Sequence, residues 1–146
     1  HSLRPVASVS RMLAAGECLA SAVRENGARS CLFLTWARAH RPAMLHHLEN
    51  SYRELARRIQ APVVPVGAAW AAAMKLPESI RPVLYEDDRS HPTFDGSYLT
   101  ACVFFCHLTG HSCRNLPYRG KPASPAAQTL QQIAEETVAQ SAKDFA

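Results

Sequence analysis

Hydrophobic residues recur along most of the chain at the spacing of an amphipathic helix. The first such segment covers residues 9–26, with an apolar stripe that includes Met12, Leu13 and Val23, and Asn26-Gly27 fits a left-handed helix end. Another long helix, the third in chain order, is expected to start after Thr93, which is a good N-cap, and to end at Gly110. The pattern therefore predicts four long helices and one short one, at about 9–26, 43–60, 68–75, 94–108 and 126–142.

Two nearly continuous apolar runs of strand length separate these helices, at residues 30–36 and 61–66. Such runs are typical of parallel strands that are covered on both faces. Helices that alternate with strands predict an α/β layer structure around a parallel sheet. Two strands are few for such a sheet, and the chain begins as though cut from something longer. We therefore expect the domain to be incomplete at its N-terminus.

Composition and charge narrow the class of protein. The 146 residues suffice for one domain, with 47% hydrophobic and 19% charged residues. The net charge of +4 comes from arginines scattered along the chain, so we expect no nucleic-acid partner. The apolar stretch 61–74 is interrupted by prolines and too short to span a bilayer, so no membrane span is expected. The first residues do not show the pattern of a signal peptide, and a secreted or periplasmic location stays open.

The loop before the third long helix carries the most informative side chains. Asp88 and His91 are separated by two residues, so the carboxylate can fold back onto the imidazole ring. A carboxylate in that position fixes the tautomer of a general base and stabilises the imidazolium that forms during reaction. Asp87, four residues before the histidine, is the other carboxylate within reach. The alternative is a solvated acidic loop in which the histidine is incidental.

The sequence around this pair resembles the C-terminal block of the SGNH (GDSL-type) hydrolases, and in particular a bacterial branch of that superfamily. The resemblance covers about residues 2–110 and rests on four short motifs: Leu34-Thr35-Trp36-Ala37, residues 63–70, Asp88-Arg89-Ser90-His91-Pro92 and Gly96-Ser97-Tyr98-Leu99. It implies a three-layer α/β/α sandwich of the flavodoxin-like type. It also implies a serine-type ester hydrolase that needs no cofactor, with His91 as the base and Asp88 as its partner. Small carbohydrate or acetyl esters are the substrates it suggests.

The chain departs from that family at the nucleophile, because no Gly-Asp-Ser motif is present. Without a nucleophile and oxyanion donors, a His–Asp pair cannot carry out acyl transfer by itself. The substitutes considered are Ser2, Ser8, Ser10 and Ser90, of which Ser2 and Ser90 are retained as candidates. His40 is a further candidate for substrate contact. We accordingly divide the chain into an SGNH-like portion at 1–116, a proline-rich connector at 117–125 and a terminal helix at 126–146 that packs on or beside the domain.

Two other interpretations stay open. The first is a non-catalytic interaction or assembly domain, whose open sheet edge is covered by a second copy or by a missing N-terminal segment. The second is a small zinc-stabilised domain that uses a cluster of soft ligands, since structural zinc requires four converging side chains. The residues of that cluster are Cys102, Cys106, His107, His111 and Cys113.

Overall fold

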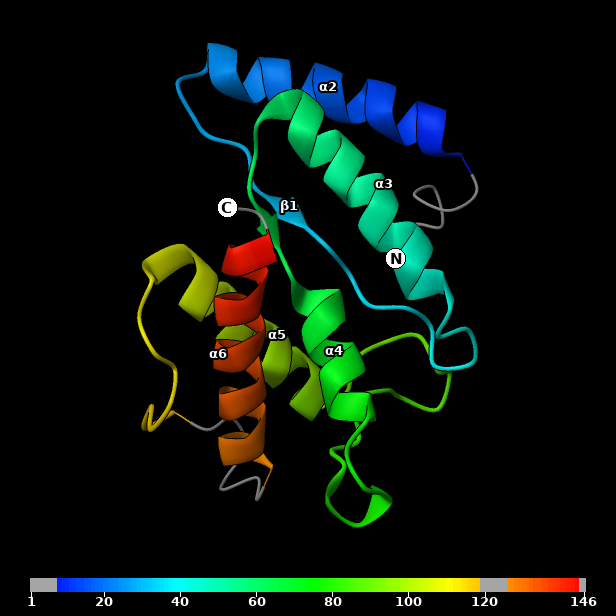
Figure 1. Ribbon diagram of the computed structural model, residues 1–146, viewed down its shortest axis with the longest axis vertical. Helices are drawn as coiled ribbons and strands as arrows, with labels where there is room; N and C mark the ends of the chain where they lie inside the picture. The colour runs from blue at the N-terminus through cyan, green and yellow to red at the C-terminus, as the bar shows by residue number, and fades with distance from the viewer. Residues whose placement is uncertain (1–7, 119–125, 145–146) are drawn as a thin grey trace.

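A computed structural model describes residues 8–118 and 126–144 of the chain. Helices dominate this part, and a single short parallel sheet lies among them (Figure 1). The elements in chain order are α2 (Val9–Glu25), β1 (Leu32–Phe33), α3 (Met44–Ile59), β2 (Val63–Val64), α4 (Val66–Met74), the 3-10 turn η1 (Glu78–Ile80), α5 (Phe94–Thr109) and α6 (Ala127–Asp144).

The predicted three-layer α/β/α sandwich is wrong. In the described residues the sheet consists of β1 and β2 alone, each two residues long, in parallel register with Leu32 opposite Val63. Prolines explain why the predicted strands are so short. Pro62 and Pro65 stand on either side of β2, and neither has an N–H group with which to extend the ladder. The chain turns into α4 directly after Pro65, where the N–H of Gly67 donates to the carbonyl of Leu34 at 2.9 Å.

The helices agree well with the predicted ones. All four long helices begin and end within two residues of the expected positions, as does the short helix α4. Thr93 caps α5 through its hydroxyl, which accepts a hydrogen bond from the N–H of Gly96 at 3.2 Å. Gly110 ends that helix with a φ of 69°. The cap and the left-handed end that the sequence predicts for α5 are therefore confirmed.

The hydrophobic core has two parts, one on each side of the sheet. The smaller part joins Leu34 and Val63 to the buried face of α3, including Leu48. The larger part joins Val64 and Trp70 to α5 and α6. Figure 1 shows α2 and α3 beside each other on one side of β1, with α4, α5 and α6 grouped on the other. Since α2 belongs to neither core, it is held mainly by α3, which approaches closely where Gly16 faces Leu55.

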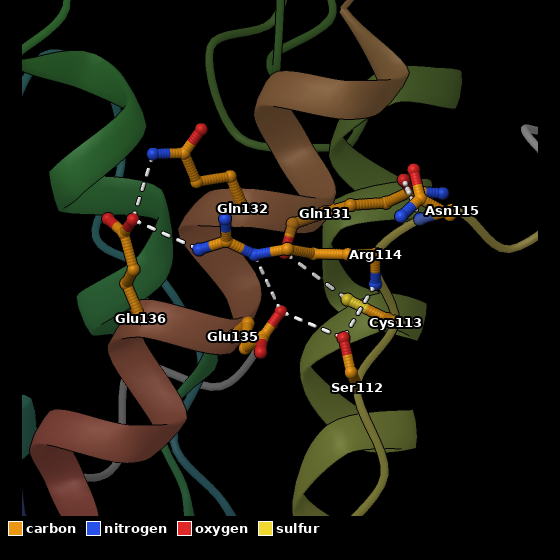
Figure 2. Close-up of polar contacts among 8 residues, drawn as sticks. All are labelled: Ser112, Cys113, Arg114, Asn115, Gln131, Gln132, Glu135 and Glu136. Atoms are coloured by element: carbon orange, nitrogen blue, oxygen red, sulfur yellow. Dashed lines mark hydrogen bonds and ion pairs between the residues drawn. The ribbon is translucent and has the colours of Figure 1, made fainter.

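The segment after α5 is tied to α6 by polar contacts (Figure 2). The guanidinium of Arg114 donates to Glu135 at 2.8 Å and to Glu136 at 3.2 Å. Next to these exposed ion pairs, the side-chain oxygen of the buried Gln131 accepts from the backbone N–H of Asn115. These contacts hold α6 against the segment that follows α5. Most of the predicted connector, from residue 119 to 125, lies outside the described residues.

Across the described ranges 8–118 and 126–144, no helix combines the length and the apolar character needed to cross a membrane.

Candidate functional site

The predicted Asp–His pair lies on a tight turn between residues 85 and 92. The N–H of Arg89 donates to the carbonyl of Glu86 at 2.8 Å, and the N–H of Glu86 donates to the carbonyl of His91 at 2.9 Å. Arg89 adopts a left-handed φ of 58°, which reverses the chain direction. One oxygen of Asp88 accepts from the backbone N–H groups of Ser90 and His91, each at 2.9 Å. The carboxylate therefore organises the turn on which the histidine is carried.

The second oxygen of Asp88 forms a hydrogen bond with Nδ1 of His91. This bond, together with the two backbone N–H groups, lowers the pKa of Asp88 from its usual value to about 2. The carboxylate is consequently charged at neutral pH. With Nδ1 engaged, Nε2 is the free ring nitrogen, and the His91 side chain is 71% exposed. This arrangement is the one that orients an imidazole as a general base.

Residues 36–39, which follow β1, hold this turn in place through three hydrogen bonds. The indole Nε1 of Trp36 donates to the carbonyl of Ser90 at 3.0 Å, and the N–H of Ala39 donates to the carbonyl of Arg89 at 3.0 Å. At the first residue of the turn, the hydroxyl of Tyr85 donates to the carbonyl of Ala37 at 2.7 Å. The pair thus lies just beyond the carboxyl end of β1, the edge at which parallel sheets usually bind ligands.

Three aromatic rings make the base of the turn rigid. Trp36 stacks on Trp70 with ring centroids 4.0 Å apart and planes 6° from parallel, and Tyr85 meets Trp70 edge-on at 4.8 Å. Burial raises the pKa of Tyr85 to about 12, so its hydroxyl stays protonated and continues to donate. Because Trp70 is 1% exposed and belongs to the larger core, the turn is connected directly to the centre of the molecule.

A surface groove of about 1030 Å³ opens beside His91. Its walls come from α2, from β1 and the residues flanking it, from α3, and from Ser90, His91 and Pro92 of the turn. The sequence did not predict this groove, because its residues are drawn from segments far apart along the chain. Ser30 and Thr35 bring hydroxyl groups to it, and no pattern in the sequence distinguishes them from other hydroxyl residues.

The described residues provide no nucleophile in contact with the base: no hydroxyl among them forms a hydrogen bond with Nε2 of His91. Ser90 is committed to the turn through its N–H and carbonyl groups. Ser2 lies outside the described residues. His40 is exposed in the loop after β1 and is not among the described residues that line the groove.

The cysteines and histidines of the alternative zinc cluster differ in burial. Cys102, Cys106 and Cys113 are buried, while His111 is exposed at the end of α5 and His107 is half-buried, lining a cavity beside α3 together with Cys106. Burial raises the pKa of Cys102 and Cys113, which favours neutral thiols over the thiolates that zinc binds. No group of three or more His, Cys, Asp or Glu side chains in the described part of the chain is placed to hold a metal ion. These cysteines therefore contribute to core packing.

Comparison with protein-family models, with curated proteins and with solved structures finds no match for this chain. The resemblance to SGNH hydrolases accordingly depends on the short motifs quoted above and on the geometry of the Asp88–His91 pair.

Proposed function

We propose that this chain supplies the general base and its orienting carboxylate to a serine-type ester hydrolase. The observation that carries the proposal is the hydrogen bond that Nδ1 of His91 donates to the carboxylate of Asp88, on a turn whose histidine lines a groove. A carboxylate that is also held by two backbone N–H groups has a fixed position. It therefore supports one tautomer and one orientation of the ring, which is what a general base requires.

The chemistry follows from this arrangement. Nε2 of His91 takes the proton from a serine hydroxyl as its oxygen bonds to the ester carbonyl carbon, and Asp88 stabilises the imidazolium. The imidazolium then returns the proton to the departing alcohol as the carbon–oxygen bond breaks, which leaves an acyl-enzyme. Water repeats the two steps with His91 as base and then acid, and releases the carboxylic acid. The serine is supplied either by Ser2 or another serine of this chain, or by an accompanying polypeptide.

A fluorophosphonate probe with intact mass measurement tests for this nucleophile. An adduct on the 16.0 kDa chain that is lost in His91→Ala supports the proposal with a serine in this chain. An adduct on an accompanying polypeptide, formed only when this chain is present, supports a shared site. Absence of any adduct, together with absence of ester hydrolysis, contradicts the proposal.

Ester hydrolysis by the variants provides the second test. We expect His91→Ala to lower kcat by about 10²–10⁴-fold, because general acid–base catalysis contributes that much. His47→Ala is the matched control, since His47 is an exposed histidine on α3 that does not line the groove. Circular dichroism of both variants checks that the helices are retained. Equal activity of the two variants would exclude His91 as the base.

A second candidate function is that of a non-catalytic assembly domain. The observation in its favour is that, in the part of the chain that the structure describes, β1 pairs only with β2, so its other edge carries no strand. An uncovered edge of this kind readily accepts a strand from another chain. Light scattering coupled to size-exclusion chromatography tests this function, and a monomer over a wide range of concentration would argue against it.

A further inference from the structure

One edge of β1 carries backbone groups that are available to a further strand. The N–H groups of Leu32 and Leu34 face β2, where they donate to carbonyls at 2.8 and 3.1 Å. Because the carbonyl and the N–H of a trans peptide unit point in opposite directions, the carbonyls of Cys31 and Phe33 face the other edge. The N–H of Thr35 faces it as well, since the carbonyl of Leu34 accepts on the β2 side. None of these outward groups forms a hydrogen bond with the described residues, so the edge can pair with another strand.

The helix α2 is placed to cover a strand at that edge. It packs beside α3, which contacts β2, and it belongs to neither part of the core. One row of its apolar side chains lines the groove beside β1, and Leu19 in that row is 67% exposed. The row consists of Met12, Ala15, Leu19, Ala20 and Val23. Helices normally cover the strands of a layered α/β structure. A strand in the groove would therefore bury side chains of α2 that are now exposed.

The groove has the length of one short strand. The α2 residues that line it, from Arg11 to Val23, span about 18 Å along the helix axis. A strand of five or six residues is about 17–20 Å long. The volume of about 1030 Å³ extends along β1, because residues 29–33 and residues 35 and 36 all line it. A segment of five or six residues can therefore lie along the whole open edge.

The charges at the two ends of the groove differ. Arg29, before the amino end of β1, lines the groove and forms no ion pair with the described residues. Figure 1 shows that α2 and the segment through β1 run in opposite directions, so Arg11 lies toward the carboxyl end of β1. The ionised Asp88 lies at that end too, beside His91. Since no carboxylate is among the described lining residues, the Arg29 end is complementary to acidic side chains.

A second copy of this chain does not match these charges. In an antiparallel pair of two β1 strands, the Arg29 end of one copy would lie near Arg38 of the other, and no acidic residue lies between these two positions in the sequence. Like charges that face each other across a pair of strands are destabilising. The occupant that fits the charges is therefore a different polypeptide.

We infer that the groove binds an extended segment of a different polypeptide, which adds to the open edge of β1 as an antiparallel strand. Apolar side chains at alternate positions of this segment face α2, and acidic residues at its carboxyl end lie beside Arg29. Antiparallel pairing is the more stable per residue, and mixed sheets commonly carry an antiparallel edge strand. The inference goes beyond the proposed functions, because this binding needs neither ester hydrolysis nor self-association.

Fluorescence anisotropy of a labelled peptide, titrated with the whole chain, tests the inference. The probe is Thr-Val-Thr-Val-Thr-Glu-Glu, with fluorescein at its amino end and an amide at its carboxyl end. Methylation of its backbone nitrogens at alternate residues removes the donors from one edge of the peptide only. One alternate set should weaken binding at least about tenfold, because edge hydrogen bonds are lost, and the other set should leave it within about twofold. Equal effects of the two sets, or no binding of the probe, would overturn the inference.

Position 35 provides a matched pair of variants on the protein side. Thr35→Pro removes the N–H that faces the open edge and leaves the N–H groups of Leu32 and Leu34 in place. Thr35→Val retains that N–H and the shape of the side chain. The affinity for the probe should fall about fivefold in Thr35→Pro and stay unchanged in Thr35→Val, with circular dichroism to check that both variants keep their helices. Equal affinities of the two folded variants would contradict strand addition at this edge.

Charge reversal at Arg29 tests the orientation of the bound segment. Arg29→Glu should weaken binding of the probe at least about threefold and strengthen binding of a probe that ends in Lys-Lys, and added salt should reduce both differences. Arg24→Glu is the control, because Arg24 is exposed on α2 and is not among the described lining residues. The same response in both variants would show that the acidic end does not lie beside Arg29.

The failure of this inference can be distinguished from the failure of the proposed functions. A dimer in light scattering that the probe does not dissociate would mean that a second copy occupies the edge, which would overturn the inference. Ester hydrolysis without binding of the probe would also overturn it and leave the hydrolase proposal standing. Binding of the probe without hydrolysis of any ester would contradict the hydrolase proposal and retain the groove as a peptide site.

Discussion

Asp88 has two structural roles at once. One of its oxygens accepts hydrogen bonds from two backbone N–H groups and holds the turn, while the other holds the ring of His91. The carboxylate is fully charged at neutral pH because each of these partners stabilises the charged form. A single residue therefore determines both the position of the histidine and the direction in which its free nitrogen faces.

Protonation of Asp88 should loosen this turn only in strong acid. Its pKa in the folded chain, about 2, lies below the usual value near 3.8, so its stabilising contribution is present above pH 4 and is lost as the pH falls toward 2. The side-chain carbonyl ¹³C shift of Asp88, followed by NMR from pH 1.5 to 6, should give a midpoint near 2. In His91→Ala the midpoint should rise, because the largest cause of the shift is removed. An unchanged midpoint in that variant would mean that the backbone N–H groups alone hold the carboxylate.

Replacing Asp88 by asparagine should damage ester hydrolysis more than the same change at Asp87. An amide at position 88 cannot stabilise the imidazolium, and it can hold the ring in the wrong tautomer. We expect kcat to fall by about 10²–10⁴-fold in Asp88→Asn. Asp87→Asn is the matched control, because Asp87 is exposed on the same turn and has no part in the hydrogen bond to His91. The opposite ranking would assign the orienting role to Asp87.

At the scale of the elements, the helices could be predicted and the sheet could not. Helical periodicity, the cap at Thr93 and the left-handed residue at Gly110 are local signals, and the structure confirms each of them for α5. The length of a strand depends on its partner's hydrogen-bonding groups instead. The apolar run at 30–36 resembles a full strand, yet its partner segment has N–H groups available only between Pro62 and Pro65. In the part of the chain that the structure describes, the result is five helices around two short strands.

The N-cap of α5 connects this helix to the turn. The hydroxyl of Thr93 accepts from the N–H of Gly96 and donates to the carbonyl of Val83, so it binds both the helix and the chain that enters the turn. We expect Thr93→Ala to reduce the free energy of unfolding by about 1–2 kcal/mol, measured by urea denaturation. Thr129→Ala, within α6, should have a smaller effect because Thr129 forms no side-chain hydrogen bond with the described residues. A loss as large for Thr129 would show that the cap contributes nothing specific.

The candidate site shows the same division between local and distant signals. Asp88 and His91 are three residues apart, so the sequence could predict that they meet, and the structure brings them together on one turn. The groove depends on how α2, β1 and α3 pack, and no local pattern encodes that arrangement. The cysteine cluster depends on distant packing as well, since the three cysteines that the sequence places near each other are buried in the larger core, whereas His111 is exposed.

In the molecule as a whole, α6 completes the larger core, and one buried amide contributes to its position. Gln131 is 1% exposed, and its amide donates to the hydroxyl of Tyr98 at 2.8 Å and accepts from the N–H of Asn115 at 3.2 Å. Gln131→Ala removes both hydrogen bonds and creates a cavity, so the free energy of unfolding should fall by about 2–4 kcal/mol. Gln132→Ala, at the neighbouring exposed position, should change it by about 0.5 kcal/mol or less. Similar losses in urea denaturation would contradict the role assigned to Gln131.

The unequal burial of the five cysteines has a practical consequence for footprinting. Cys18 and Cys31 are exposed, whereas the other three are buried, so brief alkylation should modify those two alone. Cys31 lines the groove, and Cys18, on α2, is not among the described lining residues. When a ligand or a polypeptide occupies the groove, alkylation of Cys31 should slow while that of Cys18 continues at its original rate, as peptide mass mapping would record. The native chain thus already contains a reporter thiol and an internal reference, without any engineered label.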